Sequence, residues 1–453
     1  MKFETSIKMR KEREQDSINN EFYEKFEKRY KVEYPQINNA TYYNIVNYAY
    51  DLDKPIQRWY RYKEGYSLDL NDKIFREFSV GREDTICDPF CGGGSTLLCS
   101  FLRKVKSVGF EVNPFTVLLA KVKTRFYSQQ EIKALENQIK KINQVASNGN
   151  NLSKPKLSFI DKVFDSEVLE LLLAYQEYIL SINNEKVRDL ILLAWFSILE
   201  EVSNYRKAGN GLKRKRRIEQ TTLIGKKENT RYLLKTKLNM MLKDLEVFRG
   251  KVSKEYEPEI YNVSALEMQK YLSKGSLKGV IFSPPYANCF DYTEIYKIEL
   301  WMGNFVKEYS DLKKLRKAAL RSYLSVAYNG ANNKGTLKIA ELKEILETLS
   351  KKELWDKRIP VMVNGYFEDM SVALTKVYES LKPKGFCCIV VSNSAYGGIV
   401  IPTDLLICRI AESIGFENLK VEVARYIITS SQQYKQTEFQ KRYLRESIIY
   451  LKK

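Results

Sequence analysis

Short apolar runs alternate along the chain with longer segments whose apolar residues recur every three or four positions. The short runs predict buried strands, and the longer segments predict amphipathic helices. The predicted strands cover residues 84–88, 105–110, 279–282, 385–391, 419–428 and 443–451, and the predicted helices cover 96–102, 168–179, 187–202, 362–381 and 403–414. Alternating strands and helices predict an α/β fold in which helices cover both faces of a mostly parallel sheet.

The same pattern divides the chain of 453 residues, which is long for one average domain. Residues 1–50 mix charged and aromatic residues without glycine and predict an N-terminal helical arm. We expect a core whose first part is 51–124 and whose second part is 258–453, interrupted by a helical insertion over 125–257. Residues 306–360 add a charged helical insert to the second part.

A glycine-rich turn follows the first predicted strand and reads Asp-Pro-Phe-Cys-Gly-Gly-Gly-Ser-Thr from Asp88 to Thr96. Glycines let the backbone turn tightly and approach a ligand closely, and the helix that follows offers free N–H groups. Glu111 ends the next predicted strand, where a carboxylate can accept both hydroxyls of a ribose. The turn lacks the spacing of a dinucleotide site, so we expect a different nucleoside cofactor.

A second motif, Ser-Pro-Pro-Tyr, follows the predicted strand 279–282 and occupies Ser283 to Tyr286. In this order the two motifs resemble those of the S-adenosylmethionine-dependent amino-methyltransferases, which act on N4 of cytosine or N6 of adenine in DNA. The resemblance covers roughly residues 59–115 and 260–451. It implies a Rossmann-like class I methyltransferase fold, with a seven-stranded mostly parallel sheet and a helical insertion.

The chemistry of the second motif follows from its residue types. An exocyclic amine is a poor nucleophile because its lone pair is delocalised into the ring. The Ser283 hydroxyl and the Pro284 carbonyl are acceptors for the amine hydrogens, and they would direct the lone pair at a methyl donor. Pro285 stiffens the loop, and the Tyr286 ring offers a surface on which an extruded base can stack.

The resemblance also implies which residues bind S-adenosylmethionine. These are Tyr60, Asp88, Pro89, Phe90, Cys91, Gly92, Gly94, Ser95, Glu111, Asn113, Ser264, Ala265 and Ser283. Tyr60 belongs to the aromatic segment 59–67, which either covers the cofactor or staples the sheet. Ser264 stands where relatives often carry a carboxylate. Residues 366–370 and 392–394 resemble two further motifs of the family, and core packing is the alternative for the aromatic residues of 366–370.

The identity of the target atom rests on Ser283. In this family, Ser or Thr at that position usually accompanies N4-cytosine, whereas Asp or Asn usually accompanies N6-adenine. A C5-cytosine enzyme is an alternative, because Cys289 is close enough to supply the thiolate that such chemistry requires. Asp291 and Tyr292 either line the base pocket or cap the next helix. A protein of another class, which binds nucleic acid without catalysis, would retain the same fold.

Charge favours a nucleic-acid partner, since 75 Lys and Arg against 56 Asp and Glu give a net charge of +19. A lysine-rich composition inherited from an AT-rich genome would give the same surplus. Seven cations fall between residues 206 and 217, namely Arg206, Lys207, Lys213, Arg214, Lys215, Arg216 and Arg217. This stretch predicts either a phosphate clamp or a solvated flexible link. The insertion 125–257 is the first candidate for reading double-stranded DNA, and 306–360 is the second.

The cysteine and histidine content limits which disulfides, metal sites and general bases the chain can have. The seven cysteines show no paired spacing and several lie in apolar runs, which is typical of reduced core residues. Without histidine, the chain has no histidine-based metal site or general base. We find no signal peptide and no membrane-spanning run. We therefore expect a cytoplasmic restriction-modification or phage-defence enzyme, without a metal or a membrane partner and paired with a restriction endonuclease.

Overall fold

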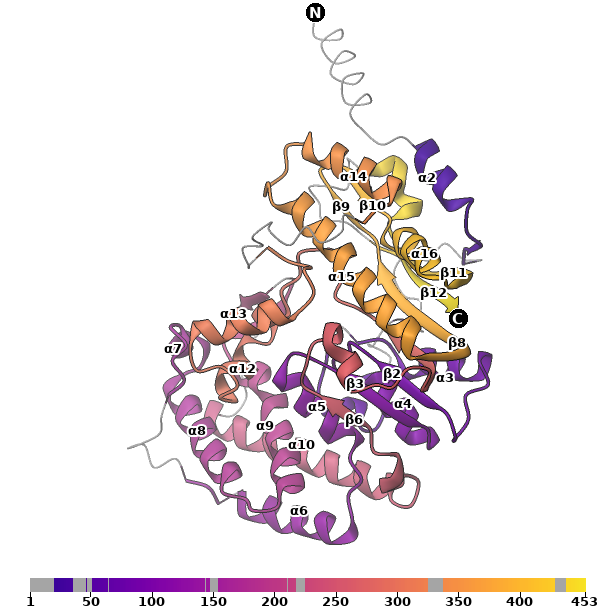
Figure 1. Cartoon of the computed structure of the whole chain (residues 1–453). Helices are drawn as coiled ribbons and strands as arrows, with labels where there is room; N and C mark the ends of the chain where they lie inside the picture. The colour runs from indigo at the N-terminus through magenta and orange to yellow at the C-terminus, as the bar shows by residue number, and fades with distance from the viewer. Residues whose placement is uncertain are drawn as a thin grey trace, which may run out of the picture.

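The structure is a computed structural model, and it describes residues 20–35, 46, 51–63, 65–142, 144–146, 154–209, 211–216, 225–324, 337–427 and 437–453. Its centre is an eight-stranded sheet of order β1-β11-β12-β8-β7-β2-β3-β6 (Figure 1). The strands are β1 Val32–Glu33, β2 Thr85–Asp88, β3 Lys106–Phe110, β6 Glu259–Tyr261, β7 Leu277–Phe282, β8 Leu381–Ser392, β11 Glu417–Tyr426 and β12 Arg445–Lys452. Only β12 runs antiparallel to its neighbours in this sheet of described residues, so the prediction of a mostly parallel α/β fold is confirmed.

The predicted strand number of seven is wrong, because β1 adds an eighth strand at the sheet edge. Val32 pairs with Val421 and Glu33 pairs with Glu422 in parallel register. Two residues are too few to show an alternating pattern in the sequence. The N-terminal arm is therefore helical only in part: helix α2 (Asn20–Glu27) precedes β1, and residues 1–19 and most of 36–50 lie outside the described residues.

Successive residues of the central strands face opposite sides of the sheet. Val280 and Phe282 pack with helices α15 (Ile359–Ser380) and α16 (Thr403–Ile414), whereas Ile281 packs on the other face with helix α3 (Leu68–Glu77). Both faces are thus covered, which explains why the central strands are continuous apolar runs rather than alternating ones.

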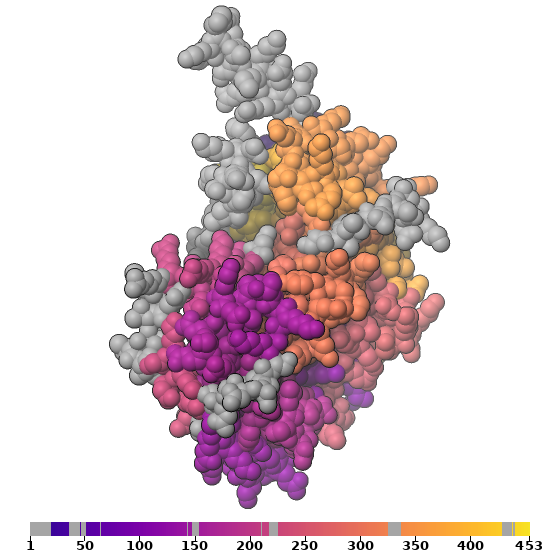
Figure 2. Space-filling view, turned by 90° about the vertical axis from the view of Figure 1, so that its left-hand side faces the viewer, coloured from indigo at the N-terminus to yellow at the C-terminus, as the bar shows by residue number. Residues whose placement is uncertain are grey.

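The middle of the chain forms a helical body, seen below the sheet in Figure 1. Its helices are α6 Gln129–Ile142, α7 Ile160–Val163, α8 Ser166–Leu180, α9 Glu185–Val202 and α10 Lys226–Phe248. One continuous apolar cluster joins them to helix α5 (Pro114–Thr124) and helix α12 (Lys297–Met302) of the core. The insertion is therefore packed onto the sheet domain. In Figure 2 its magenta side chains fill the lower part of the visible face.

The basic stretch 206–217, predicted to be either a phosphate clamp or a flexible link, is a β-hairpin where it is described. Strand β4 (Tyr205–Ala208) pairs antiparallel with β5 (Gly211–Arg214). Alternation is hidden in the sequence because few of these residues are apolar. Arg217 lies outside the described residues.

The remaining elements are short or lie in the second part of the core. They are η3 Gln57–Trp59, α4 Ser95–Arg103, η5 Lys254–Tyr256, η6 Ala265–Lys270, α11 Tyr292–Ile295, α13 Tyr309–Ala318, α14 Ala340–Ser350, β9 Ser394–Tyr396, β10 Ile399–Ile401 and η7 Glu438–Tyr443. Within the described parts of the chain, every helix is too short or too polar to cross a lipid bilayer.

Candidate active site

A cavity of about 340 Å³ lies at the carboxyl ends of the parallel strands β2, β3 and β7. Ligands bind at this edge in open α/β sheets. The glycine turn and the Ser-Pro-Pro-Tyr loop both line the cavity, although they are about 190 residues apart in sequence. The predicted site residues among its walls are Pro89, Phe90, Cys91, Gly92, Ser95, Glu111, Asn113, Ser264, Ala265, Ser283, Pro285 and Tyr286.

Four other predicted residues lie behind these walls. Asp88 and Pro284 are buried next to lining residues, and Gly94 begins helix α4 at a φ of 79°. Tyr60 is also buried, but its hydroxyl donates a hydrogen bond of 2.7 Å to Glu299 within the apolar cluster of the insertion. Tyr60 is therefore a packing residue and does not line the cavity, contrary to its predicted place in the cofactor site.

The aromatic segment 59–67 divides its residues between the core and the cavity. Trp59 donates a hydrogen bond of 2.9 Å to Asp244 of helix α10, which fastens the segment to the insertion. Tyr62 and Tyr66 line the cavity instead. Packing is thus observed at Trp59, whereas the cavity-lining Tyr62 and Tyr66 are the residues of this segment that could cover a cofactor.

Glycine is required at the turn for a steric reason. A Cβ atom on Gly92 would lie 2.8 Å from the Tyr62 hydroxyl oxygen, and a Cβ on Gly93 would lie 2.8 Å from Cδ1 of the same ring. Gly92 also has a φ of 43°, in the left-handed region. The buried Lys123 donates a hydrogen bond of 2.7 Å to the Gly93 carbonyl, and it fixes the turn from below.

Glu111 is held at the cavity wall by the backbone. Its two carboxylate oxygens accept hydrogen bonds from the N–H groups of Gly92 (3.0 Å) and Asn113 (2.8 Å). Burial raises the pKa of this carboxyl above its ordinary value, and the backbone donors oppose that shift. A carboxylate has further lone pairs, so these bonds leave acceptor capacity for hydroxyl groups of a ligand. A nucleoside cofactor with a ribose fits this arrangement.

Asp88 lies one layer deeper and shapes the turn. Its carboxylate accepts hydrogen bonds of 3.0 Å from the Phe90 N–H and from the Tyr66 hydroxyl. Burial raises the pKa of Asp88 to about 7, against the effect of these donors. The residue links the start of the glycine turn to a tyrosine of the cavity wall.

The Ser-Pro-Pro-Tyr loop is held by hydrogen bonds from its own residues and from strand β9. The Ser283 hydroxyl donates to the Tyr286 hydroxyl oxygen at 3.2 Å. Just beyond the loop, the Ala287 carbonyl accepts hydrogen bonds of 2.8 Å from the hydroxyls of Ser394 and Tyr396. Ser394 belongs to the segment 392–394 that we associated with a further motif, and its contact supports the loop.

Two charged residues in the cavity wall were missed by sequence analysis. Glu446 accepts a hydrogen bond of 2.6 Å from the Tyr286 hydroxyl, and it forms an ion pair of 2.5 Å with Nε of Arg425. Burial and the Glu446 carboxylate raise the pKa of Tyr286 well above its ordinary value, which keeps this hydroxyl a donor. Nothing in the sequence marks these residues, because only strand pairing brings β11 and β12 to the loop.

The charged insert supplies another wall. Arg316 of helix α13 forms ion pairs with Asp291 at 2.8 Å and with Glu294 at 2.6 Å. Asp291 also accepts a hydrogen bond of 2.9 Å from the Thr293 N–H and caps helix α11, and both Asp291 and Tyr292 line the cavity. Residues beyond Arg316 line the cavity, namely Ala318, Ala319, Leu320, Ser322 and Tyr323.

Cys289 follows the loop but is not among the described residues that line the cavity. It is half-buried at a φ of 61°, with its sulfur 3.4 Å from the Tyr396 hydroxyl. Burial raises the pKa of this thiol above its ordinary value. The aromatic pair Tyr366 and Phe367 is fully buried in the sheet core, so that segment is packing.

The basic hairpin stands beside the site. Strand β5 lies against helix α11, and the Gly209 carbonyl accepts a hydrogen bond of 3.3 Å from Lys63, a residue of the cavity wall. The exposed predicted cations are Arg206, Lys213, Arg214 and Arg216, and Lys215 is partly buried against helix α9. Lys207 differs from our expectation: its side chain is 6% exposed and is paired with Glu299 at 2.5 Å. This contact occupies its ammonium group, so Lys207 is not a phosphate contact.

The amino-acid sequence was compared with those of known proteins. No protein family has a model that matches the chain. The type II methyltransferase M.BsoBI of Geobacillus stearothermophilus is 27% identical over 83% of this chain and 82% of its own length. The type II methyltransferase M.AvaI of a Nostoc species is 26% identical over 84% and 83%. The type II methyltransferase M.MvaI of Kocuria varians is 22% identical over 73% and 75%. The chain is thus similar to type II methyltransferases along most of its length.

Proposed function

We propose that this protein is a site-specific DNA methyltransferase of a restriction-modification system, and that it transfers the methyl group of S-adenosylmethionine to N4 of cytosine. The observation that carries the proposal is the shared cavity, in which a glycine turn with its carboxylate faces a Ser-Pro-Pro-Tyr loop. Similarity to type II methyltransferases supports the reaction class.

The bound cofactor supplies an electrophilic methyl group on a sulfonium ion. In this proposal Gly92 and Gly93 bring the backbone close to the cofactor, and Glu111 accepts its ribose hydroxyls. The Ser283 hydroxyl and the Pro284 carbonyl accept hydrogen bonds from the target amine and orient its lone pair. Tyr286 presents its ring to the extruded base while its hydroxyl is fixed by Glu446.

N4 of cytosine is favoured over C5 because C5 chemistry needs a thiolate in the cavity. Cys289 is outside the cavity wall, and its pKa is raised rather than lowered by burial. N6-adenine remains the alternative within the amino-methyltransferases, and Ser283 in place of an acidic or amide residue argues against it. A binding protein without catalysis would show no heat of binding with S-adenosylmethionine in calorimetry.

Double-stranded DNA would approach over the hairpin β4–β5. Its exposed cations stand next to helix α11 and the cavity wall, where they can contact backbone phosphates beside the extruded base. We place the protein in the cytoplasm together with a restriction endonuclease of the same recognition sequence, since methylation would protect the cell's own DNA from that endonuclease.

The test is to express the protein in cells without other methyltransferases and to separate their DNA nucleosides by mass spectrometry. We expect N4-methylcytosine, and sequencing that reports modified bases then gives the recognition site. The Y286A variant should lose transfer and retain the fold. C5-methylcytosine, N6-methyladenine or a fully active Y286A variant would each contradict the assignment.

A further inference from the structure

Arg425 and Glu446 form a cross-strand pair at the edge of the sheet that bears the cavity. The two residues are opposite each other in the antiparallel ladder of β11 and β12, and both line the cavity. Because β12 runs against the other strands, its first residues lie at the edge where β7 ends. The pairing therefore brings Arg425 to the Ser-Pro-Pro-Tyr loop.

A continuous polar chain connects this pair to the loop. It runs from Arg425 to Glu446 (2.5 Å), on to the Tyr286 hydroxyl (2.6 Å), and ends at the Ser283 hydroxyl (3.2 Å). The Glu446 side chain is 5% exposed, so it has little contact with bulk water. Such a chain fixes the position of the guanidinium relative to the acceptors that would hold the target amine.

The guanidinium of Arg425 keeps donors available. Its Nε donates the hydrogen bond to Glu446, and its two terminal nitrogens make no hydrogen bond within the described parts of the chain. The Glu446 carboxylate balances its charge, which makes the pair a poor site for a phosphate. Two neighbouring N–H donors of a neutralised guanidinium suit a neutral planar ligand that has two neighbouring acceptors.

We propose that Arg425 reads the ring edge of the extruded base, and that Glu446 positions both Arg425 and Tyr286. This inference rests on the proposed function. Next to its amino group, cytosine carries two acceptors, N3 and O2. Adenine carries only one, N1, followed by a C–H group. A guanidinium in the wall of the same cavity as Ser283 would therefore select cytosine over adenine by hydrogen bonds that adenine cannot complete.

The test uses duplexes that contain the recognition site found by sequencing, with either cytosine or 3-deazacytosine at the target position. The analogue keeps the amino group and O2 and replaces N3 by a C–H group. Single-turnover methyl transfer and equilibrium binding with S-adenosylhomocysteine are both measured. For the unchanged protein we expect the analogue to be poorer by about 10- to 100-fold, the discrimination that a bidentate base contact provides.

In R425M this preference for cytosine should shrink about 10-fold or more, because the donor that senses N3 is gone. The matched control is K420M, which removes a cation from the same strand whose partners include Glu77, outside the cavity. K420M should keep the full preference. If R425M does not melt cooperatively, R425K is used in its place. R425K retains the charge but lacks the paired donors, so its preference for cytosine should shrink as well.

The outcomes separate the two proposals. If the unchanged protein makes no N4-methylcytosine, the proposed function fails and this inference fails with it. If N4-methylcytosine forms and R425M keeps the preference of the unchanged protein in both measurements, only the function of Arg425 is wrong. An unchanged protein that treats both duplexes equally would also refute base reading by Arg425.

Discussion

Asp88 and Lys123 place two ionisable side chains beneath the glycine turn, each about 1% exposed. Burial raises the pKa of Asp88 to about 7 and lowers the pKa of Lys123 to about 7. In both cases the protein environment favours the neutral form, because the free energy of removing the charge from water exceeds the stabilisation that nearby dipoles provide. The glycine turn therefore rests on two groups whose charge depends on pH.

The D88N variant tests the first of these groups. A carboxyl whose folded pKa is raised stabilises the fold at pH values below its unfolded pKa, and this contribution is lost as the pH rises to the folded value near 7. We expect the free energy of unfolding of D88N, relative to the parent, to improve by up to roughly 4 kcal/mol between pH 4 and pH 8. Urea unfolding at both pH values measures this difference. A constant difference would mean that Asp88 is ionised throughout.

The hairpin β4–β5 shows how an element can be anchored and exposed at once. Inside, Lys207 pairs with Glu299, and it lies 5.1 Å from the ring centroid of Tyr60 and 4.8 Å from that of Tyr296. On the opposite face, Arg206 and Lys213 lie across from each other in the hairpin and both are exposed. Alternate strand residues point to opposite faces, so one short hairpin both fastens itself to the core and presents cations next to the cavity.

K207M is expected to destabilise the protein by about 3–5 kcal/mol, because it leaves the buried Glu299 carboxylate without its counter-charge. Denaturant unfolding measures the loss. The double variant K207M/E299Q removes both charges and should recover a large part of the stability. No difference between the single and double variants would show that the ion pair is not what holds the hairpin.

Replacing Lys213 and Arg214 by alanine tests the exposed cations of strand β5. The plot of log affinity against log salt has a negative slope, and each lost phosphate contact should reduce its magnitude by about 0.9. The magnitude for the double variant should therefore fall by up to about 1.8. DNA binding is measured across a salt series. The control replaces the exposed Lys140 and Lys141 of the distant helix α6, and its slope should match that of the parent. Equal slopes for both variants would place the DNA elsewhere.

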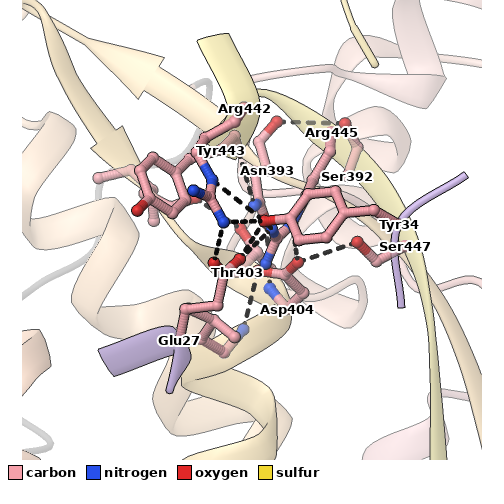
Figure 3. A network of polar contacts seen from close by, with 12 residues as sticks. Glu27, Tyr34, Ser392, Asn393, Thr403, Asp404, Arg442, Tyr443, Arg445 and Ser447 are labelled. Atoms are coloured by element: carbon pink, nitrogen blue, oxygen red, sulfur yellow. Dashed lines mark hydrogen bonds and ion pairs between the residues drawn. The ribbon is translucent and has the colours of Figure 1, made fainter. Parts of the chain in front are cut away.

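At the scale of the whole molecule, a buried network joins the N-terminal segment to the far side of the sheet (Figure 3). Arg445 is fully buried and donates to Asp404 (2.7 Å), to Glu27 (2.5 Å) and to the Tyr34 hydroxyl (2.5 Å). Its neighbour in sequence, Glu446, lines the cavity on the opposite face. Two successive residues of β12 therefore serve two separate purposes, because strand side chains alternate.

R445M should cost about 3–5 kcal/mol of stability, since Glu27 and Asp404 would remain buried without their common partner. R442M is the matched control. Arg442 also pairs with Glu27, at 2.6 Å, but its side chain is 50% exposed, so its loss should cost only about 1 kcal/mol or less. Thermal or urea unfolding compares the two variants. Similar losses would contradict the dominance of the buried guanidinium.

The sequence by itself determined the class of fold and the two motifs of the site. Strands β7 and β8 contain continuous apolar runs, and the positive φ of Gly92 favours glycine, so both features depend on the local sequence. The two-residue strand β1 and the polar hairpin could not be predicted, because neither carries enough apolar residues to show a period.

Only the tertiary structure decided which other residues join the site. Arg425 and Glu446 reach the cavity through strand pairing, Ala319 and Tyr323 reach it through the ion pairs of Arg316, and Tyr60 and Lys207 are drawn into packing. A local pattern encodes the conformation of a segment, whereas the neighbours of a side chain depend on contacts between segments that are far apart in the chain. That is why the sequence specified the motifs and left the rest of the cavity wall to the fold.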